Sequence, residues 1–270
     1  MQNKLWNEYV YGKQTAKQLG RKYCKCRQWI SAQLDKVNIN SCNDSIKSQP
    51  VVIVADTVFW GREYGITIFR EPNLKKYLVW KEVHTETPGH YQHLKLMLEQ
   101  SGFTIQAVVL DGKRGVKEVF SGLPVQLCHF HQVAIIKRYL TSKPKLSAGV
   151  ELWRIALTLA ETTEKKFVKQ LDDWHQKQET FLKEKTINPI TGKWFYTHKR
   201  VRSAYRSLKT NLPYLFIYQK YPKLYIPNTT NSLDGSFNTL KTLLRNHRGL
   251  GKENRYKMIC EIFKDHPPEY

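Results

Sequence analysis

The sequence predicts a protein of the α/β class, with one mixed sheet, a long helical segment and a small helical unit ahead of them. Three observations lead to this prediction. Short β-branched apolar runs such as Val51–Ala55 have the length and composition of buried strands. Between residues 51 and 131 such runs alternate with apolar residues at helical spacing. From residue 132 to about 226 only the helical spacing remains.

Residues 1–37 are expected to form a helix-turn-helix unit that binds DNA. A first helix would end near Gly12, a second would run from Thr15 to Gly20, and a third would cover Tyr23–Leu34. The third helix of such a unit enters the major groove, with basic residues on phosphates and polar residues at base edges. The candidate DNA-binding residues are Lys17, Lys22, Lys25, Arg27 and Gln28. The alternative is a trihelical packing or oligomerisation module. Residues 38–50, rich in Asn and Ser, are interpreted as a linker.

Residues 51–131 show a regular succession of strands and helices. Strands are expected at 51–55, 64–70, 77–83, 105–110 and 125–128, with helices at 91–100 and 112–120. The first three strands are typical of an antiparallel meander with one buried face, and the fourth is expected to return beside the first. That is a ribonuclease H-like order, so this segment is interpreted as the first part of a ribonuclease H-like core.

Two of these predicted strands end on an aspartate. Asp56 follows Val51–Ala55, and Asp111 follows the run Gln106–Leu110. Because the first and fourth strands are expected to be neighbours, the two carboxylates are expected to lie together. Paired carboxylates bind a hard divalent cation such as Mg²⁺ or Mn²⁺ and leave coordination positions for phosphate oxygens and water. The alternative is that each aspartate only starts a turn.

The chain is strongly basic, with 44 Lys and Arg against 23 Asp and Glu and a formal net charge of +21. Residues 1–50 and 131–220 carry net charges of +6 and +11, whereas residues 51–130, which hold Asp56 and Asp111, carry +1. This distribution is expected for a protein that binds double-stranded DNA on either side of a carboxylate site. The alternative is a basic surface that only aids solubility.

Residues 132–226 are expected to form an all-helical insertion. Helices are predicted at 134–140, 150–159, 164–183 and 201–208. The aromatic residues of this segment are expected to lie in its core rather than to stack on bases. They are Trp153, Trp174, Trp194, Phe195 and Tyr196.

Residues 227–270 are predicted to contain a helix that carries a third acid, followed by a C-terminal tail. The run Asn228–Asp234 offers helix-capping residues, and apolar residues follow it at helical spacing. Asp234 would lie in the first turn, where the helix dipole also favours a carboxylate that has no further role. Arg245, His247 and Arg248 are candidate phosphate contacts about three turns later, with a solvated basic helix face as the alternative.

The cysteines and the hydropathy indicate the cellular location of the protein. Five cysteines, odd in number and unevenly spaced, do not form a disulfide pattern, and the pair Cys24 and Cys26 is spaced more tightly than zinc ligands usually are. No apolar run approaches the roughly 20 residues of a membrane span, and the N-terminus lacks a signal-peptide core. A cytoplasmic location without membrane association is therefore expected, on the nucleoid in a prokaryote or in the nucleus otherwise.

Four motifs follow one another in a characteristic order. They are Ala55–Gly61 around the first aspartate, Val109–Gly112 around the second, the C-x-x-H pair Cys128–His131, and Thr229–Lys241 continuing to His247–Leu250. In this order the chain resembles DDE transposases of the Mutator (MULE-like) group and their bacterial insertion-sequence relatives. The resemblance covers residues 51–250 and departs at the third acid, which is usually Glu in the family but is Asp234 here.

The resemblance implies that Asp56, Asp111 and Asp234 are catalytic metal ligands for Mg²⁺ or Mn²⁺. The implied reaction is DNA strand cleavage and strand transfer at the inverted-repeat ends of a mobile element, without a covalent enzyme intermediate. Since two DNA ends must be held together, a homo-oligomer is expected. The alternatives are a catalytically weakened, transposase-derived DNA-binding protein and a ribonuclease H-like nuclease of DNA repair or recombination.

The resemblance also gives Cys128, His131 and Asn231 a place beside the site, and we expect them to support it. Cys128 and His131 could be a structural pair, a DNA contact or half of a metal ligand set. The structural role is favoured, because two ligands without two more do not make a zinc site.

Overall fold

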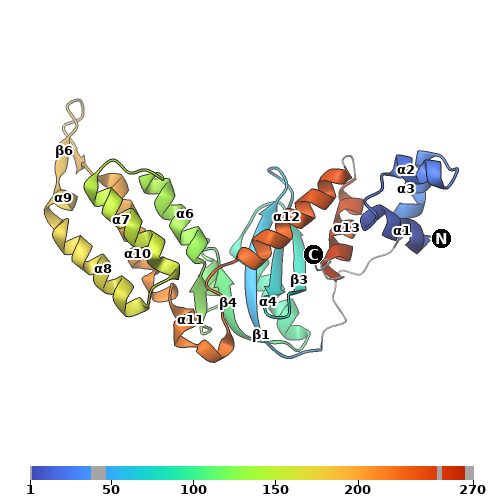
Figure 1. Ribbon diagram of the computed structural model, residues 1–270, viewed down its shortest axis with the longest axis horizontal. Helices are drawn as coiled ribbons and strands as arrows, with labels where there is room; N and C mark the ends of the chain where they lie inside the picture. The colour runs from blue at the N-terminus through green and yellow to red at the C-terminus, as the bar shows by residue number, and fades with distance from the viewer. Residues whose placement is uncertain (1, 38–46, 248–250, 265–270) are drawn as a thin grey trace. The chain divides into compact units, whose positions relative to one another are not determined.

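The structure, a computed structural model, describes residues 2–37, 47–247 and 251–264 (Figure 1). It is a mixed α/β protein with a five-stranded sheet, as the sequence predicts. The chain forms two compact units, which we describe separately. Unit 1 comprises Met1–Gln49, Asp56–Thr104 and Asn231–Tyr270, and unit 2 comprises Pro50–Ala55 and Ile105–Thr230.

The five strands of the main sheet lie where the sequence predicts strands. They are β1 (Pro50–Phe59), β2 (Gly65–Glu71), β3 (Lys76–Val83), β4 (Thr104–Leu110) and β5 (Val125–Leu127). Their order is β3-β2-β1-β4-β5, with β2 and β3 antiparallel and β4 and β5 parallel. The predicted adjacency of the first and fourth strands is therefore confirmed.

Strand β1 is longer than predicted, which corrects the placement of Asp56 at a strand end. Asp56 is the seventh of the ten residues of β1. Asp56 and Val58, two positions apart on one face of the extended strand, are both buried, at 9% and 4% exposure. Beyond it, the Trp60 N–H donates to the Tyr64 carbonyl at 2.8 Å and closes the turn into β2. Asp111, in contrast, directly follows β4 as predicted.

Strand β2 is buried along its whole length, so the predicted meander with a single buried face is wrong at this strand. Helix α4 (Pro88–Gln100) packs on β2 and β3, and α13 (Lys252–Lys264) packs on β3. On α13 the Phe263 ring lies 4.2 Å from the ring of Tyr77, measured between centroids. The Trp80 indole N–H also donates to the sulfur of Cys260 at 3.3 Å. These contacts hold the C-terminal helix on the sheet of unit 1.

The N-terminal unit contains the three predicted helices, α1 (Gln2–Val10), α2 (Ala16–Lys22) and α3 (Arg27–Asp35). Thr15 caps α2 as predicted, and its side chain forms a capping box with Gln18. Two boundaries differ from the prediction. Helix α2 runs past Gly20, and α3 begins four residues later than Tyr23, because the sulfur of Cys26 caps its N-terminus. The predicted linker 38–50 lies mostly outside the described residues, and Pro50 already belongs to β1.

The helical part of unit 2 has more elements than predicted. The α-helices are α5 (Val116–Val119), α6 (His129–Leu140), α7 (Ser147–Leu157), α8 (Glu164–Lys177), α9 (Glu179–Lys183), α10 (Lys199–Asn211) and α11 (Ile217–Lys220). Three short 3-10 helices are η1 (Thr158–Ala160), η2 (Leu212–Tyr214) and η3 (Pro222–Leu224). Helices α6, α7, α8 and α10 form one packed group (Figure 1).

Two expectations for this segment are wrong. It is not all-helical, because β6 (Lys185–Ile187) and β7 (Trp194–Tyr196) form an antiparallel hairpin. Nor do all its aromatic residues lie in a core: Trp174 is 3% exposed, but Trp194 is 56% exposed. Residues Asn188–Gly192 form the turn between the two strands, and the Gly192 N–H donates to the Asn188 carbonyl at 2.9 Å.

Helix α12 (Asn231–Asn246) completes unit 1 and confirms the predicted third-acid helix as an element. Its inward side chains include Leu233, Phe237 and Leu240. The structure describes the backbone of Asp234 but not its side chain. Within the described part of the chain, no helix is both long and apolar enough to cross a membrane.

Candidate functional site

Asp56 lies in the interior of unit 1 with a set of hydrogen-bonded groups nearby. Its Oδ1 accepts a hydrogen bond from the Thr57 N–H at 2.7 Å. The Thr57 hydroxyl is 2.9 Å from the Thr67 hydroxyl and 3.2 Å from the Tyr91 hydroxyl. The Tyr91 hydroxyl donates to Glu86 at 2.7 Å. Asp56 on β1 is thus bound by the backbone of Thr57, and the Thr57 side chain starts a chain of hydrogen-bonded hydroxyl groups. That chain ends at the carboxylate of Glu86.

The pKa of Tyr91 shows that its hydroxyl is affected by the neighbouring carboxylates. Burial raises the pKa of Tyr91 well above its ordinary value, and the charges of Glu86 and Asp56 raise it further. Tyr91 therefore stays protonated and keeps donating at neutral pH. Glu86 and Tyr91 were not among the predicted site residues. Tyr91 sits at the start of the apolar stripe of α4, where the sequence shows a core residue and gives no sign of a polar role.

Asp111 lies in unit 2 at the carboxyl end of β4. Its Oδ1 accepts a hydrogen bond from the Lys113 N–H at 2.9 Å, across Gly112, whose φ is +95°. This is the turn chemistry of the alternative interpretation, and it occupies one of the two carboxylate oxygens. The strand before it is held firmly, because the Cys128 N–H donates to the Leu110 carbonyl at 2.8 Å.

The three predicted metal ligands therefore differ in what the structure says of them. Asp56 lies on β1, Asp111 follows β4, and Asp234 is the fourth residue of α12, with its side chain outside the described atoms. Among the described residues, no three or more His, Cys, Asp or Glu side chains form a group suited to a metal ion. Because the side chain of Asp234 is not among the described atoms, the three-acid set stays a prediction. Carboxylate oxygens are the donor type that Mg²⁺ and Mn²⁺ prefer.

In unit 2, buried Cys128 and Thr230 form a cluster with half-buried His131. Cys128, 1% exposed, is the residue before α6, and His131 lies in the first turn of that helix. The Thr230 N–H donates to the Cys128 sulfur at 3.3 Å, and the Thr230 hydroxyl lies 3.4 Å from that sulfur and 3.4 Å from His131 Nδ1. The His129 N–H also donates to the Asn228 carbonyl at 2.9 Å. The C-x-x-H pair thus anchors residues 228–230 to the start of α6.

This geometry helps to choose among the three roles considered for Cys128. A thiol that is 1% exposed is not placed to contact DNA. Burial alone would raise its pKa, but hydrogen bonds from His131 and Thr230 stabilise the thiolate more strongly, and the pKa is lowered. The structural, site-supporting role fits best, because the cluster fixes the residue directly before α12. Asn231, the first residue of α12, is exposed.

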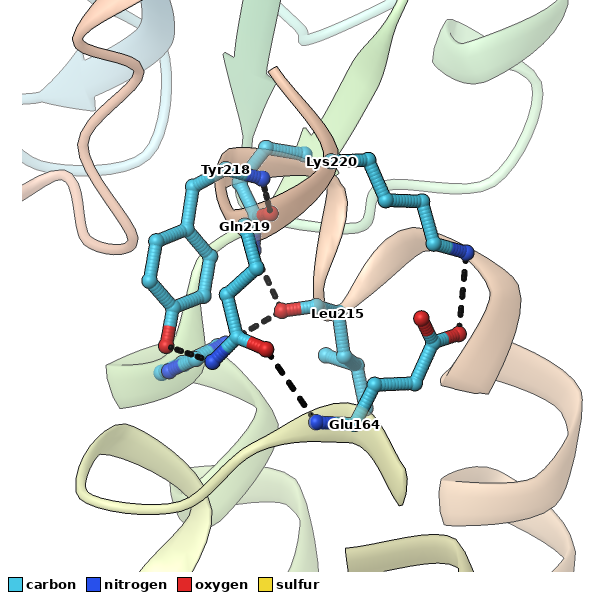
Figure 2. Close-up of polar contacts among 7 residues, drawn as sticks. Glu164, Leu215, Tyr218, Gln219 and Lys220 are labelled. Atoms are coloured by element: carbon cyan, nitrogen blue, oxygen red, sulfur yellow. Dashed lines mark hydrogen bonds and ion pairs between the residues drawn. The ribbon is translucent and has the colours of Figure 1, made fainter. Parts of the chain in front are cut away.

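A second polar network supports the same end of unit 2 (Figure 2). The Gln126 side-chain amide donates to the Leu215 carbonyl at 2.9 Å and accepts from the Tyr218 N–H at 3.1 Å. His129 makes a further hydrogen bond to the same Leu215 carbonyl. Nearby, Gln219 accepts from the Glu164 N–H at 3.1 Å and so joins α11 to the start of α8. No sequence motif indicated this network.

The predicted DNA-binding residues of the N-terminal unit are all exposed, as expected. They are Lys17, Lys22, Lys25, Arg27 and Gln28. Arg27 and Gln28 open α3, so they lie at the end of the helix that would meet base edges. Lys22 is less available, because its ammonium pairs with Glu8 at 2.9 Å. Arg245 is exposed in the last turn of α12, and Arg248 lies outside the described residues.

Unit 1 also contains a cavity of about 490 Å³ between the N-terminal helices and the C-terminal ones. Lys17, Arg27, Asp35, His247 and Asn254 are among its lining residues. His247, a candidate phosphate contact from the sequence, is only 5% exposed, and neither of its ring nitrogens has a hydrogen-bond partner among the described residues. Its ring packs on the ring of Tyr9 with 4.2 Å between centroids. The cavity thus places an unpaired imidazole near two cations and a carboxylate.

A scan of protein-family models finds none that matches the chain, and a search of curated proteins finds no match either.

Proposed function

We propose that this protein is a metal-dependent enzyme that cleaves and joins DNA strands, a transposase built on a ribonuclease H-like sheet with an inserted helical segment. One observation carries the proposal. Asp56 lies on β1, Asp111 directly follows β4, and these two strands are neighbours in the sheet. Carboxylates on adjacent strands are a common arrangement for binding a divalent cation at a phosphate ester.

In this proposal Asp56, Asp111 and Asp234 supply oxygen ligands for Mg²⁺ or Mn²⁺. The bound metal would activate water or a DNA 3′-hydroxyl and stabilise the leaving oxygen. Hydrolysis breaks one backbone P–O bond and frees a 3′-hydroxyl. That hydroxyl then attacks a target phosphodiester, forming one P–O bond as another breaks. Asp234 is one methylene shorter than Glu, so α12 would have to approach the metal more closely to serve as ligand.

Two further observations support the proposal. The N-terminal unit has three helices with exposed basic residues at the start of the third, as in units that insert a helix into the major groove. The buried Cys128–Thr230 contact fixes the residue before the helix that carries Asp234. Such an anchor is expected where a third ligand must be held in place.

The experiment uses the purified full chain, Mg²⁺ or Mn²⁺, and a duplex that carries the inverted repeat flanking the gene. Asp56→Asn and Asp111→Asn should each lower strand cleavage by about 1,000-fold, because each removes a charged metal ligand, and should leave duplex binding within about 2-fold. Asp234→Asn should behave in the same way, whereas Asp234→Glu should keep activity. The control is Asp173→Asn, an exposed carboxylate on α8.

Wild-type cleavage by Asp56→Asn and Asp111→Asn would show that the metal ligands are assigned wrongly. Tight end binding with no cleavage in either metal would identify a transposase-derived DNA-binding protein instead. Cleavage that prefers branched DNA to linear ends would identify a nuclease of repair or recombination.

A further inference from the structure

The hairpin of β6 and β7 is a well-ordered projection from the helices of unit 2 (Figure 1). Its strands pair in register, with Ile187 opposite Trp194 and Lys185 opposite Tyr196. The Asn188 side chain caps the turn by accepting from the Ile190 N–H at 2.9 Å and from the Thr191 N–H at 3.1 Å. The turn is therefore preorganised by its own hydrogen bonds rather than by packing against other elements.

The tip of this hairpin is apolar and open to solvent. Ile187, Ile190 and Trp194 are 67%, 91% and 56% exposed. Single exposed apolar side chains are ordinary, but three within eight residues of one rigid turn make a concentrated apolar surface. Ile187 and Trp194 lie on the same face, because residues directly opposite each other in a ladder project to one side. This surface suits a partner that can cover apolar groups.

Cations surround the same strands. The Lys185 ammonium lies 4.0 Å from the centroid of the Trp194 ring, and the Lys199 ammonium lies 4.1 Å from that of Phe195. The Arg202 guanidinium lies 3.5 Å from the Tyr196 ring centroid. Such contacts orient the long side chains beside the rings without neutralising their charge.

The charge of the hairpin and its base is almost entirely positive. Residues 183–202 contain six Lys and Arg and one acid, Glu184. That acid is already engaged, since its carboxylate lies 2.7 Å from His198 Nε2. Cations flanking exposed apolar side chains match the two parts of a nucleic acid, its phosphates and its base stack.

We propose that the β6–β7 hairpin is a second DNA-binding element, in which the cations contact duplex phosphates while Ile190 and Trp194 wedge into the base stack. Apolar side chains inserted from the minor groove unstack base steps, and aromatic rings stack on the bases so exposed. This inference goes beyond the proposed function, because duplex binding and local unstacking require neither a metal nor cleavage. An anionic membrane surface would attract a similar combination of groups, so vesicles form part of the test.

The test uses the full chain in EDTA with a fluorescein-labelled duplex of about 30 base pairs and mixed sequence. A second copy of the duplex carries 2-aminopurine at the adenine positions of one strand, and its fluorescence rises when bases unstack. Anisotropy gives the affinity at several salt concentrations. Wild-type protein should bind both duplexes and raise the 2-aminopurine signal.

Ile190→Ser and Trp194→Ala should each weaken binding by about 5- to 100-fold and abolish most of the 2-aminopurine rise. Lys185→Ala and Lys193→Ala should reduce the slope of log affinity against log salt by about one each. The matched controls are Leu157→Ser, an apolar residue of unit 2 that is 51% exposed, and Lys165→Ala on α8. Both controls should bind as the wild type does. All four hairpin side chains are exposed, so the variants should fold, and far-UV circular dichroism checks this.

Unchanged affinity and unchanged 2-aminopurine signal in Ile190→Ser and Trp194→Ala would overturn the proposal. So would hairpin-dependent binding to phosphatidylserine vesicles without hairpin-dependent binding to the duplex. Failure of the proposed function is distinguishable from either result. Hairpin-dependent binding in EDTA should be present whether or not the wild-type chain cleaves DNA once Mg²⁺ is added.

Discussion

The sulfur of Cys128 accepts a hydrogen bond from the backbone N–H of Thr230 at 3.3 Å, although 102 residues separate them along the chain. Thr230 is the last residue of unit 2, and α12 begins at the next residue. The contact therefore fixes the point from which the chain enters the helix that carries Asp234. A buried backbone N–H without this acceptor would remain unsatisfied.

Cys128→Ala should lower the free energy of unfolding by about 1–3 kcal/mol, because it removes the acceptor for Thr230 and leaves a small cavity. Urea unfolding followed by circular dichroism measures the change. Cys24→Ala, at an exposed thiol, is the control and should stay within about 0.5 kcal/mol. Equal stability of the two variants would show that the anchor contributes nothing to the fold.

Gln126→Leu should destabilise the protein by about 2 kcal/mol at nearly constant volume. Gln126 is fully buried and joins β5 to the Leu215 carbonyl and the Tyr218 N–H. Replacing it leaves a buried donor and a weakened acceptor site without adequate partners, which costs more than the hydrogen bonds alone would. Thermal unfolding of Gln126→Leu against Gln176→Leu, an exposed position on α8, isolates this effect from the change of residue type. A similar midpoint for both would contradict the prediction.

The sequence predicted the strands well, because the residues of each strand are enough to identify it. β1, β4 and β5 are short apolar runs, and any arrangement that buries them must place them inside a sheet. The same local reasoning failed at Asp56. A carboxylate after five apolar residues resembles a strand end, and only the pairing with other strands keeps β1 extended to Phe59.

The aspartates of the candidate site could be proposed from the sequence, but the side chains that surround them could not. The position of Asp111 at the end of a strand is indicated by the next residue, Gly112, which suits a turn. The link from Thr57 through Tyr91 to Glu86 joins a residue of β1, a residue of α4 and a residue of the loop before α4, and each looks ordinary in its own segment. Trp194 was expected in a core because large aromatic side chains usually are. Nothing local shows that the hairpin strands stand clear of the helices and leave this ring 56% exposed.

Glu8→Gln should strengthen duplex binding by about 2- to 5-fold at low salt. Glu8 holds the Lys22 ammonium at 2.9 Å and lowers the number of free charges on the basic face of the N-terminal unit. Glutamine can still accept the hydrogen bond from the Tyr23 hydroxyl, so the packing should survive. Fluorescence anisotropy at two salt concentrations checks the change.

Two companion variants test the same electrostatic argument. Arg27→Ala should weaken binding more than Lys22→Ala does, because no ion pair with Arg27 is described and Lys22 is already paired. If Lys22→Ala and Arg27→Ala weaken binding equally, and Glu8→Gln changes nothing, then the pair with Glu8 does not control the charge that the unit presents to DNA.

His247 should make the fold sensitive to mild acid. Burial lowers the pKa of its imidazole below the usual value near 6.5, because the buried ring loses the water that would stabilise its charged form. Lys17 and Arg27 line the same cavity and disfavour a further positive charge there, while Asp35 opposes them. Because the folded pKa lies below the unfolded one, protonation favours the unfolded chain. The stability contributed by neutral His247 is present above about pH 6.5 and is lost as the pH falls towards the folded pKa.

His247→Phe should therefore reduce the loss of stability between pH 7.5 and pH 5.5 by about 1 kcal/mol, while its ring keeps the contact with Tyr9. Urea unfolding at both pH values measures the difference. Leu96→Phe, at an exposed and non-titrating position on α4, is the control and should leave the pH dependence as in the wild type. His129 is also buried with a lowered pKa, so part of the acid sensitivity should remain in His247→Phe. An identical pH dependence in wild type and His247→Phe would mean that this imidazole finds a partner when it is protonated, and that the cavity is not the barrier to its charge.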